Sequence, residues 1–166
     1  MTDETTESLS DLATRTLADC RARGLTVATA ESCTGGLVAA ALTEIAGSSD
    51  VVDRGFVTYS NAAKAAMLGV PMPLIESVGA VSVEVARAMA EGAIAAAGVD
   101  IAVAITGIAG PGGATATKPV GLVHFATARR GGQTVDERHV VPGDRAAIRR
   151  RSVAIALRMI REAAAR

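Results

Sequence analysis

Residues 25–46 read LTVATAESCTGGLVAAALTEIA, and the fold assignment starts from them. The first six, residues 25–30, form a short run of β-type and apolar residues, and residues 37–46 form a helical stretch. A turn with two glycines, residues 31–36, joins the two segments. The pattern therefore predicts a strand, a tight turn and a helix in succession, which is typical of α/β proteins.

Periodicity and turn residues place the other elements around this unit. Two proline residues, Pro71 and Pro73, predict a loop between two helices. The order of elements predicts a three-layer α/β/α sandwich with a mixed sheet of about five strands, one pair of them an antiparallel hairpin. Further strands are expected at residues 51–60, 100–106, 121–128 and 134–141, and further helices at residues 9–23, 61–68, 83–97 and from 144 to the C-terminus.

Length and charge restrict the class of protein. The chain has 166 residues, 49% of them apolar, and its 17 basic and 17 acidic residues give no net charge. This length predicts one domain, residues 8–166, preceded by a polar, disordered leader at residues 1–7. A neutral chain argues against a nucleic-acid coat protein or a polybasic membrane binder. The sequence shows no apolar run long enough for a membrane span and no signal peptide, so we expect a cytoplasmic protein.

The neutral total conceals an asymmetry between the two parts of the chain. Residues 1–128 hold 7 basic and 13 acidic residues, a balance of −6, and residues 129–166 hold 10 and 4, a balance of +6. The basic part could hold an anion. Alternatively, its arginines form a solvated helix face that pairs with the acidic part, which is the interpretation we favour for Arg149, Arg150 and Arg151.

The sequence predicts no metal site. Its two cysteines, Cys20 and Cys33, are too few for a disulfide framework and lack the spacing of a zinc site. Its two histidines, His124 and His139, lie fifteen positions apart without a metal-binding motif.

The turn after the first strand is the first candidate for chemistry. Ser32 at this position would point outward as a nucleophile, and the backbone N–H groups of Thr34, Gly35 and Gly36 could stabilise the negative charge of an attacked carbonyl. The alternative is structural, because Ser32 or Thr34 could simply cap the helix that follows.

A serine nucleophile needs a base, and Lys64 is the best candidate. It lies in the apolar segment AAKAAML, where partial burial would lower its pKa toward neutrality. It could equally be a surface lysine whose stem covers apolar groups. Tyr59, five residues earlier, could hydrogen-bond the serine or the lysine, or be an ordinary aromatic residue at the sheet edge.

Residues 107–119 form a glycine-rich loop that is longer than a simple connection requires. The loop follows a buried strand, at the end where open α/β sheets bind ligands, but it matches no dinucleotide or ATP motif. It is therefore a candidate binding loop, or else a flexible connection, with Lys118 and Arg145 as possible anion partners. The candidate binding residues in and before the loop are Thr106, Gly107, Gly110 and Gly112.

Four segments together resemble a known family. They are AESCTGG at residues 30–36, YSNAAKAAMLGV at 59–70, TGIAGPGG at 106–113 with KPVG at 118–121, and GDR at 143–145. In this order they are similar to the C-terminal domain family of the competence/damage-inducible protein CinA, over residues 8–163.

The resemblance implies an activity. Stand-alone members of the family are nicotinamide-nucleotide amidohydrolases, which convert nicotinamide mononucleotide into nicotinic acid mononucleotide and ammonia without a cofactor. Carried onto this sequence, Ser32 would be the nucleophile, Lys64 the base and Tyr59 an assisting residue. The loop from Thr106 to Gly113 and Arg145 would bind the pyridine nucleotide.

The sequence departs from the family pattern at two points, and two functions other than catalysis are alternatives. Ala114 stands where the family has a further glycine, and Cys33 is a rival nucleophile. The long form of the family has a molybdopterin-binding-like domain without a counterpart here, so its activities are not carried over. The alternatives to an enzyme are a non-catalytic nucleotide-binding regulatory module and a structural oligomerisation domain. We expect a homodimer or higher homo-oligomer.

Overall fold

Strands and helices alternate up to residue 68 in this computed structural model, which describes residues 7–166, and two further helices, three strands and a last helix follow. The predicted leader at residues 1–7 therefore lies outside the described residues except for Glu7. The elements are α1 (Leu9–Ala22), β1 (Val27–Glu31), α2 (Leu37–Thr43), the 3-10 turn η1 (Ser48–Asp50), β2 (Val52–Val57), α3 (Asn61–Leu68), α4 (Met72–Val78), α5 (Val83–Ala97), β3 (Ile101–Gly107), β4 (Leu122–Arg129), β5 (Val135–Val140) and α6 (Arg145–Ala164).

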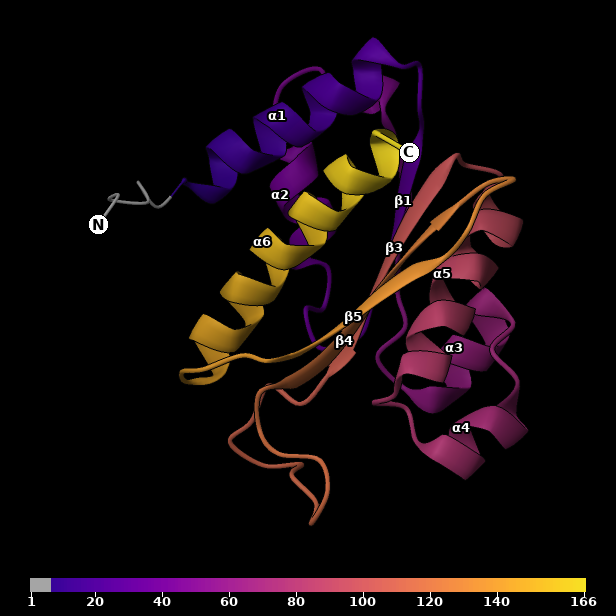
Figure 1. Ribbon diagram of the computed structural model, residues 1–166, viewed down its shortest axis with the longest axis vertical. Coiled ribbons are helices and arrows are strands. Elements are labelled where there is room, and N and C mark those ends of the chain that lie inside the picture. The colour runs from indigo at the N-terminus through magenta and orange to yellow at the C-terminus, as the bar shows by residue number, and fades with distance from the viewer. Residues whose placement is uncertain (1–6) are drawn as a thin grey trace.

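The strands form one mixed sheet in the order β2-β1-β3-β4-β5. β1 pairs in parallel with β2 and β3, and β4 is antiparallel to both β3 and β5. Helices α1, α2 and α6 cover one face of the sheet, and α3, α4 and α5 cover the other (Figure 1). The predicted three-layer α/β/α sandwich with an antiparallel hairpin is thus confirmed.

Both faces of the central strands are buried, which explains their continuous apolar runs. All five residues of β1 are buried, and alternate side chains belong to the two cores. Val27 packs with the core under α1 and α6, whereas Ala28 and Ala30 pack under α5. Because β3 also turns two alanines, Ala102 and Ala104, toward α5, that helix packs against small side chains.

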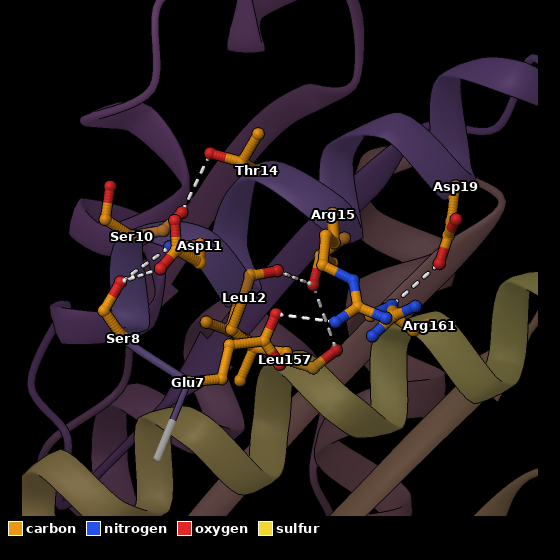
Figure 2. Close-up of polar contacts among 11 residues, drawn as sticks. Glu7, Ser8, Ser10, Asp11, Leu12, Thr14, Arg15, Asp19, Leu157 and Arg161 are labelled. Carbon is orange, nitrogen blue, oxygen red and sulfur yellow. Dashed lines mark hydrogen bonds and ion pairs between the residues drawn. The ribbon is translucent and has the colours of Figure 1, made fainter. Parts of the chain in front are cut away.

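Polar contacts join the first and last helices on the outside of the sandwich (Figure 2). The Ser8 hydroxyl caps α1 by accepting a hydrogen bond from the backbone N–H of Asp11. Arg161 of α6 pairs with Asp19 of α1 at 2.7 Å (Figure 2). The Arg161–Asp19 pair joins α6 to α1, and α6 in turn packs on the sheet.

The prediction of a loop around Pro71 and Pro73 is wrong, because α4 (Met72–Val78) begins there. Pro71 is the N-cap, and Pro73 lies in the first turn. A proline in the first turn breaks no intrahelical hydrogen bond, since the N–H groups there have no partner within the helix. The two prolines therefore start a helix.

The carboxyl ends of β1, β2 and β3 lie at one edge of the sheet, because these three strands run in parallel. The N–H of Ser32 donates to the carbonyl of Ile105 at 2.9 Å, and the N–H of Thr58 donates to the carbonyl of Glu31 at 2.9 Å, so the segments after the strands stay in register. The long loop between β3 and β4 extends beyond this edge (Figure 1). All candidate residues of the sequence analysis follow these strands or face this edge.

We predict that Gly92→Ala destabilises the fold, because α3 and α5 touch at this glycine. A Cβ atom at position 92 would lie 1.9 Å from the carbonyl oxygen of Leu68, the last residue of α3. Forcing the helices apart should lower the free energy of unfolding by about 1–3 kcal/mol in urea denaturation. Ala96→Ser, at an exposed position of the same helix, is the control and should change it by less than about 0.5 kcal/mol. Equal stabilities for the two variants would contradict this packing.

Candidate active site

Ser32 and Lys64 meet at the carboxyl end of β1. The Lys64 Nζ lies 3.1 Å from the Ser32 Oγ and donates to the carbonyl of Thr58 at 2.9 Å. Ser32 directly follows β1, and Lys64 lies on α3, which Ser60 caps by accepting from the N–H of Ala63. Lys64 is only 1% exposed, so the alternative of a surface lysine is wrong.

Burial makes Lys64 a suitable proton acceptor. It lowers the pKa of the Lys64 ammonium from its ordinary value of 10.5, because the charged form loses its hydration; the Cys33 side chain would oppose this shift only where its thiol is ionised. Cys33 is also buried, and burial raises the pKa of its thiol to about 11. A thiol of that pKa is protonated near neutral pH, which argues for Ser32 over Cys33 as the nucleophile.

Neither Ser32 nor Thr34 caps the helix after the turn, so that alternative is wrong. The N-cap of α2 is Gly36, in a left-handed conformation with φ 102°, so the N-cap residue itself makes no side-chain cap hydrogen bond. The fully buried carboxylate of Glu31 accepts instead from the N–H of Val38 at 2.8 Å and from that of Ala39 at 3.1 Å. The Ser32 hydroxyl is therefore free to face Lys64.

The backbone N–H groups of the turn differ in what they can bind. The N–H of Gly35 donates to the carbonyl of Ser32 at 3.0 Å, so it is not free for a substrate, contrary to expectation. Within residues 7–166, the N–H groups of Thr34 and Gly36 donate to no other backbone group. Two of the three expected oxyanion donors thus stay available.

Arg149 of α6 holds the same turn from the other side. Its Nε donates to the carbonyl of Cys33 at 3.1 Å, and its Nη2 donates to the carbonyl of Thr34 at 3.2 Å. The interpretation as a solvated face is therefore wrong for Arg149, although Arg150 is exposed and Arg151 donates to the carbonyl of Pro142.

Arg145 connects the glycine-rich loop to Tyr59. Its Nη1 donates to the carbonyl of Gly110 at 2.9 Å, and its Nη2 donates to the Tyr59 hydroxyl at 3.3 Å. The Tyr59 side chain is 63% exposed and its hydroxyl contacts Arg145, not the serine or the lysine. Only the carbonyl of Tyr59 reaches Lys64, at 3.5 Å from its Nζ. A cavity of about 510 Å³ lies beside this contact and is lined by Ala109, Pro111, Val120, Gly143, Asp144, Arg145 and Ala146.

The other candidate residues around the loop have structural partners. Lys118 Nζ donates to the carbonyl of Val78 at 2.8 Å, at the end of α4. The Thr106 hydroxyl donates to the carbonyl of Ala80 at 2.8 Å and is buried. These contacts anchor both ends of the loop to the segment that follows α4, which leaves Arg145 as the basic residue at the cavity.

Gly107 and Gly112 occupy different environments. A Cβ at Gly107 would lie 2.8 Å from the carbonyl oxygen of Leu122, so this glycine allows β3 and β4 to approach closely. A Cβ at Gly112, in the exposed part of the loop, would meet no atom within 4 Å. Steric demand therefore explains Gly107 but not Gly112, and it also applies to Gly110, where a Cβ would lie 2.6 Å from Val120 Cγ1.

The described part of the chain contains neither a cluster of metal ligands nor a membrane-spanning helix. No group of three or more His, Cys, Asp or Glu residues there could hold a metal ion. No helix within those residues is long and apolar enough to cross a membrane.

Residues 9–164 match the family described as the CinA C-terminal domain. The chain belongs to the CinA C-terminal domain family. A CinA-like protein of Mycolicibacterium vanbaalenii is 57% identical over 140 residues, which cover 84% of this chain and 33% of that protein. The chain thus spans about a third of the length of this relative.

Shorter members of the CinA C-terminal domain family match from end to end. The nicotinamide-nucleotide amidohydrolase PncC of Escherichia coli (strain K12) is 51% identical over 160 residues, covering 96% of this chain and 95% of that protein. The crystal structure of competence/damage inducible protein CihA from Agrobacterium tumefaciens superposes with a TM-score of 0.92 at 50% identity, covering 98% of this chain and 99% of that one. Family membership predicted from the four motifs is confirmed, while the homo-oligomer stays a prediction.

We predict that Lys64 makes stability depend on pH in a defined direction. Because the pKa of Lys64 is lowered in the folded state, the unfolded chain binds more protons between that pKa and 10.5. The stabilising contribution is therefore complete above 10.5 and is lost as the pH falls through the folded-state pKa. Urea denaturation should show wild type gaining stability relative to Lys64→Met as the pH rises from about 7 to about 10. Parallel pH profiles would contradict the burial of an ionisable lysine.

Proposed function

We propose that this protein hydrolyses the carboxamide of nicotinamide mononucleotide, giving nicotinic acid mononucleotide and ammonia. The observation that carries the proposal is the 3.1 Å contact between the Ser32 Oγ and the buried Lys64 Nζ. A protein that only binds nucleotides has no need of a hydroxyl facing a buried amine. The amidohydrolase PncC of Escherichia coli, which matches this chain over almost its full length, supports the same reaction by its name.

In this mechanism the two side chains form a nucleophile and base pair. Neutral Lys64 takes the proton of the Ser32 hydroxyl while the Ser32 Oγ attacks the amide carbon. The tetrahedral intermediate then collapses, the C–N bond breaks, and Lys64 returns the proton to the leaving amine, which departs as ammonia. Water, deprotonated by the same lysine, attacks the acyl-enzyme; the bond from the acyl carbon to the Ser32 Oγ breaks, Lys64 returns the proton to this oxygen, and the nicotinate product is released. The net change consumes one water molecule for each ammonia released.

The free N–H groups of the turn would stabilise the intermediate. The N–H groups of Thr34 and Gly36, neither of which donates to another backbone group within the described residues, lie within four positions of Ser32. Donors held in place before the reaction stabilise a developing oxyanion without the cost of reorganisation. Gly35 would contribute through its conformation, φ 56°, rather than through its N–H.

The phosphate end of the nucleotide fits the basic side of the site. Arg145 lines the 510 Å³ cavity between the glycine-rich loop and the start of α6, where a guanidinium can make charge-assisted hydrogen bonds to phosphate. Tyr59, which accepts a hydrogen bond from Arg145, would orient this side chain and so assist the reaction indirectly. The proposed mechanism requires neither a metal nor an organic cofactor.

We predict that purified protein releases ammonia from nicotinamide mononucleotide without added metal, and that Ser32→Ala and Lys64→Ala each reduce kcat at least about 10³-fold. Removing either partner leaves no activated nucleophile. Cys33→Ala is the matched control at the adjacent position and should keep activity, because its thiol is protonated. Saturable nucleotide binding by wild type without ammonia release would overturn the proposal in favour of a regulatory binding module.

A second prediction concerns Arg145. Arg145→Met should raise KM for nicotinamide mononucleotide about 10–100-fold, since a charge-assisted contact to phosphate is lost. With nicotinamide riboside, which has no phosphate, wild type and variant should have the same kcat/KM. An equal loss on both substrates would show that Arg145 acts on the loop or Tyr59 and does not bind the phosphate.

A further inference from the structure

We infer that Arg149 is a positioning residue that orients the backbone N–H of Thr34 toward the reacting carbonyl. The inference rests on the proposed acyl-transfer function and concerns a residue whose side-chain hydrogen bonds, within the described residues, both go to the backbone of the nucleophile turn. Arg149 reaches this turn from α6, 115 or more positions away in sequence.

Arg149 orients the peptide unit between Cys33 and Thr34. In a trans peptide the C=O and N–H bonds point in opposite directions. Arg149 Nε holds the Cys33 carbonyl at 3.1 Å, so the N–H of Thr34 must point away from Arg149. Among residues 7–166, no other hydrogen bond to this carbonyl is seen, so Arg149 alone fixes its direction.

The two faces of the sheet decide where that N–H points. Arg149 belongs to α6, which packs on the face covered by α1 and α2 (Figure 1). Lys64 belongs to α3 on the opposite side, and its Nζ contacts the Ser32 Oγ. A Thr34 N–H directed away from α6 is therefore directed to the side of the Ser32 hydroxyl, where the substrate carbonyl would be attacked.

The second contact of Arg149 fixes the next peptide unit. Its Nη2 donates to the carbonyl of Thr34 at 3.2 Å. The same carbonyl also accepts from the N–H of Leu37 at 3.0 Å. A planar guanidinium can hold two neighbouring carbonyls at once, whereas a lysine ammonium cannot reproduce this fork. The turn needs such a restraint because Gly35 and Gly36 both have positive φ, 56° and 102°, and glycine adopts many other conformations at little cost.

The first test separates binding from catalysis. Arg149→Lys and Arg149→Ala should lower kcat for nicotinamide mononucleotide about 10–100-fold, because a misoriented donor stabilises the oxyanion poorly. KM should change less than about 2-fold, and the pH at which activity rises should stay the same, because Lys64 is untouched. Guanidinium ion added at millimolar concentration should partly restore kcat of Arg149→Ala but not of wild type. Arg150→Met, at the adjacent exposed position, is the matched control and should behave as wild type.

A second readout does not depend on the natural substrate. Phenylmethanesulfonyl fluoride should react with Ser32, forming an O–S bond as fluoride leaves and Lys64 accepts the proton. This reaction also places negative charge on an oxygen, so its rate should fall about 10-fold or more in both Arg149 variants and stay unchanged in Arg150→Met.

The outcomes distinguish the two proposals. If wild type fails to deamidate the nucleotide but its sulfonylation still depends on Arg149, the proposed substrate is wrong and the role of Arg149 stands. If wild type deamidates the nucleotide and the Arg149 variants keep kcat and the sulfonylation rate, the role of Arg149 is wrong and the proposed function stands. A wild-type protein that is neither active nor sulfonylated at Ser32 would overturn both.

Discussion

The burial of one amino group, that of Lys64, is the constraint on which the arrangement of the site depends. An ammonium group deprived of water is unstable unless it is hydrogen-bonded, and the groups that accept from it are the carbonyls of Thr58 and Tyr59 and the hydroxyl of Ser32. These acceptors lie just after the ends of β1 and β2, so α3 must bring Lys64 close to the segments that leave both strands. The close contact of α3 with Gly92 on α5 meets this requirement.

The lowered pKa of Lys64 also fits the placement of the charged groups around it. A carboxylate beside the amine would stabilise its charged form and make it a poor base. The buried carboxylate near the turn, Glu31, instead accepts hydrogen bonds from the N–H groups of Val38 and Ala39 on the other side of the strand. The Glu31 carboxylate thus binds the first N–H groups of α2. The side chain that Lys64 contacts is the hydroxyl of Ser32.

Local patterns in the sequence were sufficient for the sheet and for five of the helices, but they named Ser32 and Lys64 only as candidates, each with a structural alternative. They failed at α4, where the two prolines suit the first turn of a helix as well as a loop. They also failed at Arg149, because the charge pattern does not indicate a contact between residues 33 and 149. An arginine in a basic helix is instead predicted to be exposed to solvent. Glu31 carried a clearer signal, since an acidic residue within a buried strand needs donors, and the N–H groups of the next helix are the nearest ones.

The two arginines of α6, one helical turn apart, connect segments that lie far from each other in the chain. Arg145 contacts the glycine-rich loop and Tyr59, and Arg149 contacts the nucleophile turn. This arrangement has a consequence for a nascent chain, in which residues 32 and 64 leave the ribosome well before α6 (Arg145–Ala164). The serine and lysine are synthesised early, but the turn and the loop acquire their tethers only when the last helix docks. The order of synthesis therefore delays a complete site until the sandwich has closed.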